Sequence, residues 1–384
     1  MQYDAPVTSA DFLTALSDNP SLSASTVEAI SSLLNLDSAE TEVVVASYNG
    51  RTVTVLADET PDAVVTSIDG AADTNVTVRV PSSLADASVW IMNSDANLTA
   101  TFNTPTAVTT QAADVTVGDE TATIDRAVVS GNGNDTITIT GDASVYLDGG
   151  DGNDTLTTGN GNDVVLGGNG NDTINTGAGN DYIDGGAGSD VINAGAGDDT
   201  IIAGVGDTVD GGEGFDVLQV SDAVTRVFVE NNHTVVLQTA NGEVAAQNVQ
   251  LVETADGNIA IASSLTEATA LRLYEAVLGR SADAEGAQFW TETLAANGSN
   301  LTQIAEGFIN SVEFQSNGVV SDADFINTLY EGALGRTAED AGMAFWQAQL
   351  DSGVSRADVT IGIVGSYEAE GYEGSNVLII QGQV

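Results

Sequence analysis

The chain of 384 residues contains no cysteine and no lysine, and its eight basic residues are all arginine. Without cysteine, neither disulfides nor thiolate metal sites can form. The 56 acidic residues outnumber the basic ones so heavily that the formal net charge is -48. Such a chain cannot neutralise a run of phosphates, so a nucleic-acid binder is excluded, and docking on an anionic membrane surface is disfavoured. The charge favours cations as partners, above all a hard divalent cation with oxygen ligands.

Membrane and export signals are absent as well. Residues 1–20 contain no basic residue and no apolar run of signal-peptide length, so no Sec-type signal is expected. No run of 18 consecutive apolar residues occurs, so no transmembrane helix is expected. Taken alone, these absences indicate a cytoplasmic protein, an interpretation that the repeats described below replace.

Catalytic signatures are also scarce. The single histidine, His233, lies in an expected hairpin, and there is no HExxH motif, so a zinc protease of that type is excluded. There is no GxSxG motif, and a phosphate-binding GxxxxGK loop cannot exist without lysine. Carboxylate pairs of the kind that glycosidases use occur throughout such an acidic chain and discriminate nothing. We expect no catalytic residue and no enzyme.

Three regions of different pattern divide the chain, and its length suits two or three domains. Residues 1–127 begin with two short segments of helical spacing and continue in alternating β-branched runs, which suggest a small sandwich or an irregular β-layer. Within them, residues 48–51 have the sequence YNGR between valine-rich runs, which predicts a β-hairpin. Residues 128–263 carry glycine-rich repeats followed by closing strands, and residues 264–384 are helical in pattern.

Glycine is concentrated in one part of the chain, with 23 of the 42 glycines between Gly131 and Gly214. Residues 149–202 form six consecutive nonamers with glycine at the second and fourth positions, aspartate at the sixth and an aliphatic residue at the eighth. Their sequences are GGDGNDTLT, TGNGNDVVL, GGNGNDTIN, TGAGNDYID, GGAGSDVIN and AGAGDDTII. An outlying copy begins at Ser130. A flexible glycine-rich linker needs no period and no aspartate at a fixed phase, so the pattern favours a stacked repeat.

One nonamer cannot bury its aliphatic side chain, whereas two nonamers make an 18-residue coil, and stacked coils bury these side chains in a continuous core. Repeats two apart then lie above one another, with strands about 4.8 Å apart. This stacking places the aspartates in two rows, with Asp154, Asp172 and Asp190 on one edge and Asp163, Asp181 and Asp199 on the other. Carboxylates at such spacing repel one another unless a cation neutralises them.

A Ca²⁺ ion between each stacked pair would remove this repulsion, because calcium accepts carboxylate and carbonyl oxygens at about 2.3–2.6 Å. Mg²⁺ fits less well, since it demands a stricter octahedron and retains its waters. The regular repeats predict at least four calcium sites, at the pairs Asp154/Asp172, Asp163/Asp181, Asp172/Asp190 and Asp181/Asp199. The outer copies would add a few more through Asp135, Asp207 and Asp216.

The block from Ser130 to Gln219 resembles the hemolysin-type calcium-binding repeats of RTX proteins, whose signature is GGxGxDxUx. The resemblance implies a parallel β-roll that binds several Ca²⁺ ions through the sixth-position aspartates and the carbonyls of the glycine loops. The metal-binding residues that it implies are Asp135, Asp154, Asp163, Asp172, Asp181, Asp190, Asp199, Asp216, Gly150, Gly152, Gly159, Gly161, Gly167, Gly168, Asn169, Gly170, Gly177, Gly179, Gly186 and Gly188. It also implies secretion by a type I machinery that reads an uncleaved C-terminal signal, with which the apolar segment 376–380 is compatible.

The helical region contains a second repeat, with an offset of 56 residues. LYEAVLGRSADAEGAQFWTETL from Leu273 matches LYEGALGRTAEDAGMAFWQAQL from Leu329. The shared motif resembles a helical domain of unknown function that often follows RTX repeats in secreted bacterial proteins and is distantly similar to phycobilisome linker domains. The expected fold is therefore multidomain: a β-rich N-terminal domain, a parallel β-roll and a C-terminal all-α domain.

The residues that both copies share have structural explanations. The expected core residues are Tyr274, Leu278, Phe289 and Trp290, and the expected helix caps are Gly279 and Gly335. Arg280 is expected to pair with a carboxylate such as Asp283, and Arg336 with one such as Glu339. The functional alternative is that this module contacts a partner, either another copy of the chain or a cell-surface glycan.

Together these features predict a secreted, calcium-binding structural protein of the bacterial cell surface or extracellular matrix. It would assemble with copies of itself into a surface layer, sheet, filament or biofilm matrix, with calcium between subunits to offset the charge. In calcium-poor cytosol the repeats would stay unfolded, and extracellular calcium would drive folding. The alternatives are an adhesin that holds a glycan or host surface and, less favoured, a polysaccharide-acting enzyme or its non-catalytic accessory.

Overall fold

The computed structural model describes residues 7–20, 22–36, 42–48, 53–54, 61–67, 74–80, 87–103, 113–117, 120–230, 233–297, 300–318, 321–372 and 374–380. The described residues fall into two compact units, the first within residues 1–230 and 234–248 and the second within 249–384. Among these residues, no helix combines the length and the apolar character needed to cross a lipid bilayer.

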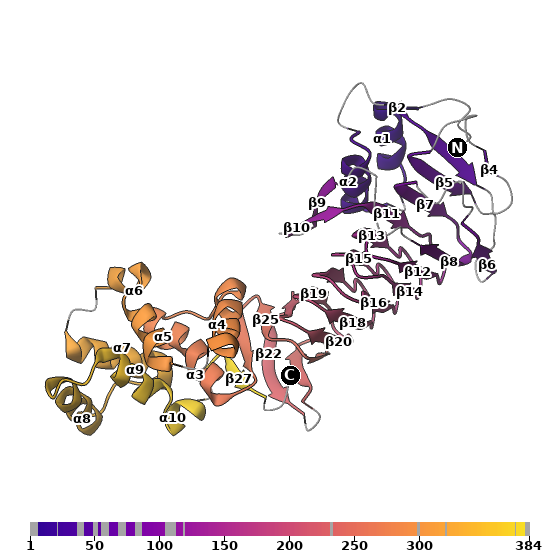
Figure 1. The fold of residues 1–384 in the computed structure, drawn as a ribbon. Coiled ribbons are helices and arrows are strands. Elements are labelled where there is room, and N and C mark those ends of the chain that lie inside the picture. Colours follow the sequence, from indigo (N-terminus) through magenta and orange to yellow (C-terminus); the bar gives the residue numbers. More distant parts are fainter. Residues whose placement is uncertain are drawn as a thin grey trace. The chain divides into compact units, whose positions relative to one another are not determined.

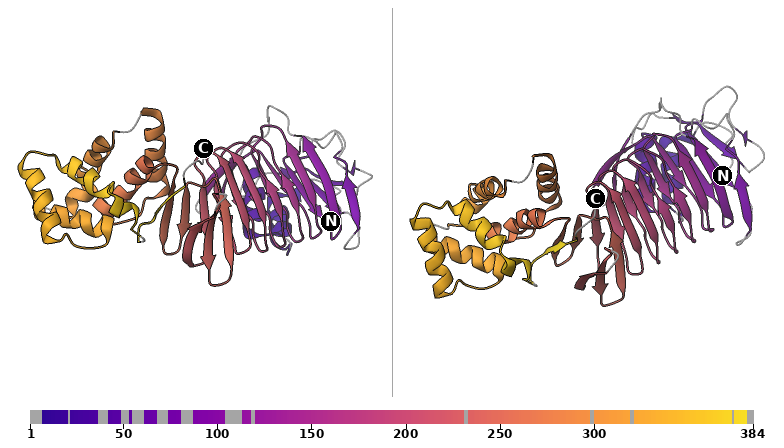
Figure 2. Two further views of the ribbon diagram at one scale, coloured as in Figure 1. Left: turned by 90° about the horizontal axis from the view of Figure 1, so that it is seen from below. Right: turned by 60° about the horizontal axis from the view of Figure 1, so that its bottom comes forward.

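The first unit is built from two ladders of parallel strands that stack coil upon coil (Figures 1 and 2). One ladder contains β3 (Val45–Tyr48), β5 (Ala63–Ser67), β7 (Val89–Asn93), β11 (Arg126–Val129), β13 (Val145–Asp148), β15 (Val164–Leu166), β17 (Tyr182–Asp184), β19 (Thr200–Ala203) and β21 (Val217–Val220). The other contains β6 (Asn75–Val78), β8 (Asn97–Asn103), β12 (Thr136–Thr140), β14 (Thr155–Thr157), β16 (Thr173–Asn175), β18 (Val191–Ala196), β20 (Thr208–Glu213) and β24 (Glu243–Gln247). Antiparallel strands β23 (Val235–Thr239) and β22 (Val224–Val229) follow β24 at the end of the second ladder.

The eighth-position aliphatic residues explain the stacking. Leu156, Ile174 and Ile192 lie in parallel register in one ladder, and each is only 1% exposed. Burial of one such side chain contributes about 1.5–3 kcal/mol, so a continuous column of them holds the coils together. The parallel β-roll predicted from the repeats is confirmed.

The strands before residue 127 continue the same ladders. Val64 pairs with Trp90, and Trp90 pairs with Val128, in parallel throughout. The ladder therefore runs without a break through residue 127, where the sequence placed a domain boundary. The described residues of this region are β-rich as expected and lead into the repeats, but they form parallel ladders and not a sandwich. Parallel pairing joins segments that are distant in sequence, so it leaves no local signal between most of these strands.

Short antiparallel pairs accompany the ladders. β3 pairs with β4 (Val53–Thr54) as the YNGR motif predicts, and the turn at 49–52 lies outside the described residues. The other two pairs are β1 (Val7–Thr8) with β2 (Glu42–Val43), and β9 (Ala113–Val117) with β10 (Glu120–Ile124).

Two N-terminal helices, as the sequence predicts, pack against one ladder of the first unit (Figure 1). These are α1 (Ser9–Ser17) and α2 (Ala24–Leu33), and in each the residue before the helix caps its N-terminus with a hydroxyl oxygen. Phe12 and Ile30 from the helices lie in one buried cluster with strand residues such as Tyr146. The helices thereby cover apolar residues of the roll that would otherwise face solvent.

The second unit joins a small sheet to a helical region. In the sheet, β25 (Leu251–Thr254) is antiparallel to β26 (Gly257–Ala262), and β27 (Val377–Ile379) is parallel to β26. The helices are α3 (Leu265–Leu273), continued by the π-helical turn η2 (Tyr274–Leu278), then α4 (Ala284–Asn297), α5 (Leu301–Ile309), α6 (Val312–Ser316), α7 (Asp322–Leu334), α8 (Asp340–Asp351), α9 (Arg356–Val364) and α10 (Tyr367–Glu370). The expected C-terminal helical region is confirmed, and the apolar segment near the C-terminus forms β27.

Candidate metal centre

Glycine loops connect the two ladders at both edges of the roll. At the second and fourth positions of five of the six nonamers the backbone takes φ values that L side chains rarely adopt, as at Gly168 (φ +103°) and Gly170 (φ +141°). A Cβ at Gly170 would also overlap the carbonyl oxygen of Gly152 in the preceding coil. Glycine at these positions therefore lets successive loops pack backbone against backbone.

The sixth-position aspartates form two hydrogen-bonded rows. The backbone N–H of Asp154 donates to Oδ1 of Asp172, and that of Asp172 donates to Oδ1 of Asp190, each at 2.8 Å. The opposite edge repeats the pattern at the same distance with Asp163, Asp181 and Asp199. Both rows continue into the outer copies, through Asp207 and Asp216. The structure therefore brings the aspartates together in the two expected rows and uses one oxygen of each carboxylate to hold the neighbouring coil.

The second oxygen of most of these carboxylates has no partner. Oδ2 is buried and accepts no hydrogen bond in Asp154, Asp163, Asp172, Asp181, Asp190 and Asp199. A buried anionic oxygen without a partner is strongly unfavourable. Burial, the largest cause, raises the pKa to about 8 for Asp154 and Asp181 and to about 6 for Asp190 and Asp199. A cation beside either row would therefore stabilise the ionised form of these carboxylates.

A small space beside the first-position glycines brings these oxygens together with backbone carbonyls. A Cβ on Gly149 would lie 2.6 Å from Oδ2 of Asp154 and 2.6 Å from the carbonyl oxygen of Gly167. A Cβ on Gly167 would likewise lie 2.7 Å from Oδ2 of Asp172 and close to the carbonyl oxygen of Gly185. A carboxylate and a carbonyl that converge on a space too tight for a methyl group suit a hard cation such as calcium. Sequence reasoning missed Gly149 and Gly185, although the GG doublet that opens alternate nonamers marks them.

The carbonyl ligands that the sequence predicts divide into two sets. At the second position, the carbonyl oxygen already accepts a backbone N–H from the neighbouring coil in Gly150, Gly159, Gly168 and Gly177. For Gly186, the hydrogen bond found is a different one, in which its N–H donates to Oδ1 of Asp184. Within residues 120–230, which are all described, the fourth-position carbonyls accept no hydrogen bond, at Gly152, Gly161, Gly170, Gly179 and Gly188. The carbonyl oxygen of Asn169 accepts from the N–H of Gly152 at 2.7 Å, and its side chain donates to Asp151.

Backbone carbonyls would have to supply much of any coordination shell. Among the described residues, no three His, Cys, Asp or Glu side chains lie close enough together to hold a metal ion. Calcium takes 6–8 oxygen ligands and accepts backbone carbonyls readily, so this donor set fits calcium better than a transition metal.

Asp135 and Asp207 differ from the other aspartates. Oδ2 of Asp135 accepts the backbone N–H of Gly131 at 3.2 Å, and Oδ2 of Asp207 accepts that of Gly204 at 2.7 Å. These two carboxylates have both oxygens satisfied by the chain, so the need for a cation is weakest at these positions.

A second pair of ladders, formed by the fifth-position side chains, was missed by sequence reasoning. On one edge, Oδ1 of Asn153 accepts the N–H of Asn171, whose own Oδ1 accepts that of Ser189. On the other edge, Oδ1 of Asn162 accepts the N–H of Asn180 at 2.9 Å. The signal was present, because four of the six nonamers have asparagine at this position.

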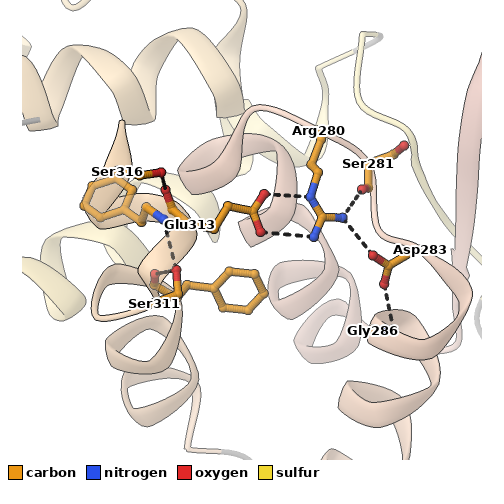
Figure 3. A network of polar contacts seen from close by, with 9 residues as sticks. Arg280, Ser281, Asp283, Gly286, Ser311, Glu313 and Ser316 are labelled. Atoms are coloured by element: carbon orange, nitrogen blue, oxygen red, sulfur yellow. Dashed lines mark hydrogen bonds and ion pairs between the residues drawn. The ribbon is translucent and has the colours of Figure 1, made fainter. Parts of the chain in front are cut away.

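The arginines shared by the two copies of the helical repeat form ion pairs with carboxylates, as expected. Nε of Arg280 donates to Glu313 at 2.8 Å, and Nη1 donates to Asp283 at 3.1 Å (Figure 3). The guanidinium also lies 5.0 Å from the centroid of the Tyr274 ring. In the second half, Arg336 binds Glu339 and Glu368 and stacks on its own tyrosine, Tyr330. The expected caps Gly279 and Gly335 have φ +72° and +64°.

The expected placement of Phe289 in the core is wrong. Tyr274 is buried, and Leu278 and Trp290 are half-buried, but Phe289 is 57% exposed and its counterpart Phe345 is 55% exposed. Adjacent residues on a helix point about 100° apart, so the two aromatic residues of the FW pair cannot both face the core. The tryptophan takes the inner position and stacks on Phe308, with ring centroids 5.6 Å apart.

Comparison with known families agrees with this geometry. The RTX calcium-binding nonapeptide repeat matches in four copies, at residues 140–174, 148–183, 175–207 and 184–218. The domain of unknown function DUF4214 matches residues 267–318 and 305–372. No curated protein matches the chain. RTX nonapeptide repeats bind calcium, and the proteins that contain them are usually secreted. The chain therefore carries calcium-binding RTX nonapeptide repeats followed by a DUF4214 domain, as the resemblances in its sequence imply.

Proposed function

We propose that the protein is a secreted structural component of the bacterial cell surface or extracellular matrix, folds on calcium, and is not an enzyme. The observation that carries this proposal is the set of six buried Oδ2 atoms, from Asp154 to Asp199, without a hydrogen-bond partner. At neutral pH the metal-free roll must either bury these groups as carboxylates without a partner or keep them protonated, and both disfavour the folded state. A ligand that binds only the folded chain shifts the equilibrium towards folding, so calcium drives the transition.

The ligands in this proposal come from the roll itself. Each ion takes Oδ2 of a sixth-position aspartate together with glycine carbonyls of adjacent coils, such as the carbonyl of Gly167 beside Asp154. The regular repeats provide at least four such sites. Extracellular calcium modules bind with Kd about 10⁻⁴–10⁻³ M, which keeps the roll unfolded in cytosol and folded outside the cell. An unfolded, calcium-free chain also suits export by a type I machinery.

Self-assembly is the second part of the proposal. A molecule with a net charge of -48 repels its copies, so a lattice or filament requires cations between subunits as well as within them. Calcium therefore promotes both folding and contact between copies, with folding as the first step.

Circular dichroism and light scattering on the full chain test the two parts separately. Titration with calcium after dialysis against a chelator is expected to produce strand signal first and particles larger than a monomer afterwards, whereas magnesium at equal concentration produces neither. A spectrum and melting temperature that do not respond to chelation would overturn calcium-driven folding. A folded protein that stays monomeric at millimolar calcium would overturn assembly alone.

A further inference from the structure

The first residue of the nonamer differs between the two edges of the roll. On the edge that contains Asp172 the first residue of each regular nonamer is glycine, whereas on the edge that contains Asp181 it is threonine or alanine. These first residues are Gly149, Gly167 and Gly185 on one edge and Thr158, Thr176 and Ala194 on the other. We call the two rows of loops the glycine edge and the threonine edge.

On the glycine edge the first-position carbonyls of the inner coils are free. Within the described residues 120–230, no hydrogen bond ends on the carbonyl oxygen of Gly167 or of Gly185. Each of these oxygens faces Oδ2 of the aspartate one coil earlier, Gly167 beside Asp154 and Gly185 beside Asp172. An ion that binds either Oδ2 atom on this edge therefore finds a carbonyl that is ready to accept it.

On the threonine edge the equivalent carbonyls are already engaged. Oγ1 of Thr158 donates to the carbonyl oxygen of Thr176 at 2.9 Å, and Oγ1 of Thr176 donates to that of Ala194 at 2.7 Å. Both threonines are buried, at 6% and 0% exposure, so solvent does not compete for these bonds. Burial raises the pKa of Asp163 and Asp181, whereas the neighbouring threonine hydroxyls lower it. The threonine side chains thus lie between the aspartate and the carbonyl that a cation would have to bridge.

The outlying copy shows the same relation on the other edge. Its first residue is Ser130, whose Oγ donates to the carbonyl oxygen of Gly149 at 2.5 Å. The aspartate of this copy is Asp135, whose two carboxylate oxygens both accept hydrogen bonds from the chain. A hydroxyl at the first position therefore engages the carbonyl of the next coil on either edge, and glycine leaves that carbonyl free.

We propose that the hydroxyls of Thr158 and Thr176 compete with calcium for the first-position carbonyls, so the threonine edge holds its ions less tightly than the glycine edge. This inference rests on the calcium binding proposed above and adds an order of loading to it. An ion on the threonine edge must displace a hydroxyl from its carbonyl, whereas an ion on the glycine edge meets a free one. One such hydrogen bond corresponds to a difference of about three- to tenfold in affinity. The glycine edge therefore fills first as calcium rises, and the threonine edge fills afterwards.

Two reciprocal substitutions exchange the chemistry of the edges. Thr176→Gly removes the hydroxyl and frees the carbonyl of Ala194. Gly167→Thr places a hydroxyl on the glycine edge, where the backbone of Gly167 lies outside the left-handed region and so accepts a side chain. Thr173→Gly is the control for added chain flexibility, because Thr173 lies three residues away with its side chain exposed on β16.

The test is the release of calcium from the loaded full chain after rapid mixing with a fluorescent calcium chelator. Sucrose keeps the roll folded during the measurement. We expect a fast phase from the threonine edge and a slow phase from the glycine edge, with rates about three- to tenfold apart. Thr176→Gly should move amplitude from the fast phase to the slow one, and Gly167→Thr should move it in the opposite direction. Thr173→Gly should change neither phase.

Terbium assigns the fast phase to an edge, because this hard cation takes oxygen ligands and emits when a nearby tyrosine is excited. Tyr182 directly follows Asp181, and the three nonamers of the glycine edge contain no aromatic residue. Emission sensitised by tyrosine should therefore decay in the fast phase when a chelator is added. The proposal is overturned if release has a single phase, if this emission decays in the slow phase, or if Thr176→Gly speeds release, which would make the hydroxyl a ligand. A parent chain that binds no calcium would instead refute the proposed function, so the two failures are distinct.

Discussion

Each repeat aspartate has two oxygens with different tasks. In Asp172, Oδ1 accepts the N–H of Asp154 at 2.8 Å, whereas Oδ2 is buried without a partner. The first oxygen stabilises the stack with or without metal, and the second destabilises it unless a cation is bound. A mutation that replaces Oδ2 should therefore lower the stability of the roll when calcium is bound and should not lower it when calcium is absent.

Asp172→Asn is expected to show this reversal. The amide keeps an oxygen for the ladder but replaces the calcium-binding oxygen and its charge with an N–H₂ group. At millimolar calcium the variant should bind fewer ions and melt lower than the parent, by roughly 2–4 °C for each 1 kcal/mol lost. In chelator it should be at least as stable as the parent, because a buried amide is less unfavourable than a buried carboxylate.

Asp135→Asn is the matched control, since both oxygens of Asp135 already accept hydrogen bonds from Leu98 and Gly131. It should leave the calcium stoichiometry unchanged and destabilise the roll equally with and without calcium. Calcium titration gives the stoichiometry, and melting curves with calcium, and in chelator with an osmolyte such as sucrose to keep the roll folded, give the stabilities. Equal loss of calcium in the two variants would contradict the assignment of Oδ2 as the ligand.

The pH dependence of stability is expected to have opposite slopes with and without calcium. Burial raises the pKa of Asp154 and Asp181 from 3.8 to about 8, so between these values the metal-free folded state holds more protons than the unfolded state. The metal-free roll must then lose stability as the pH rises from about 4 to about 8. With calcium present, protons compete for the same oxygens, so calcium affinity rises over the same range. Denaturant midpoints of the calcium-loaded protein, and of the metal-free protein held folded by an osmolyte such as sucrose, measure both slopes, and parallel slopes would refute the mechanism.

At the scale of elements, the sequence predicted the strands that repeat at a short, regular interval and missed the pairing between strands that are far apart in the chain. The nonamers carry their own period, so the strands around Ile174 and the rows of aspartates followed from the spacing. Upstream, Oδ1 of Asn97 accepts the N–H of Asn134, 37 residues away instead of 18. Insertions between the coils remove the period there, so parallel pairing of β5 and β7 could not be distinguished from a sandwich. Phe289 was misplaced because motif similarity does not show which residue of an adjacent pair faces inward.

The glycines of the helical repeat give a prediction at this scale. A Cβ on Gly286 would overlap the hydroxyl of Tyr274, whereas a Cβ on Gly307, in α5, would meet nothing within 4 Å. Gly286→Ala should destabilise the second unit by about 1–3 kcal/mol. Gly307→Ala should stabilise it by up to about 1 kcal/mol, because alanine favours a helix. Urea unfolding followed by tryptophan fluorescence measures both changes, and the same sign for both variants would contradict this packing.

At the scale of the whole molecule, the buried carboxylates that lack a hydrogen-bond partner are concentrated in the first unit. The six unpartnered carboxylate oxygens lie between Asp154 and Asp199 in the first unit, and no carboxylate among the described residues of the second unit shares this state. The acidic side chains of the helical region include several that pair with arginine, such as Glu313 and Glu368. Under the proposed function calcium is therefore required by the roll, and the described carboxylates of the helical domain give no such reason for a metal.

Chelation is accordingly expected to unfold the roll while helical signal persists. Sodium chloride at about 1 M reduces the Debye length to about 3 Å and screens repulsion between aspartates, but it supplies no ligand to the buried Oδ2 atoms. Screening alone should therefore fail to restore the roll, whereas millimolar calcium at low ionic strength should succeed.

Circular dichroism separates the strand and helix contributions. The fluorescence of Trp90, fully buried in the first unit, reports on the roll in a chain whose Trp290 and Trp346 have been replaced by phenylalanine. Recovery of the Trp90 signal in sodium chloride would mean that net charge, and not specific coordination, controls folding. Loss of the helical signal in chelator would mean that the second unit depends on the first.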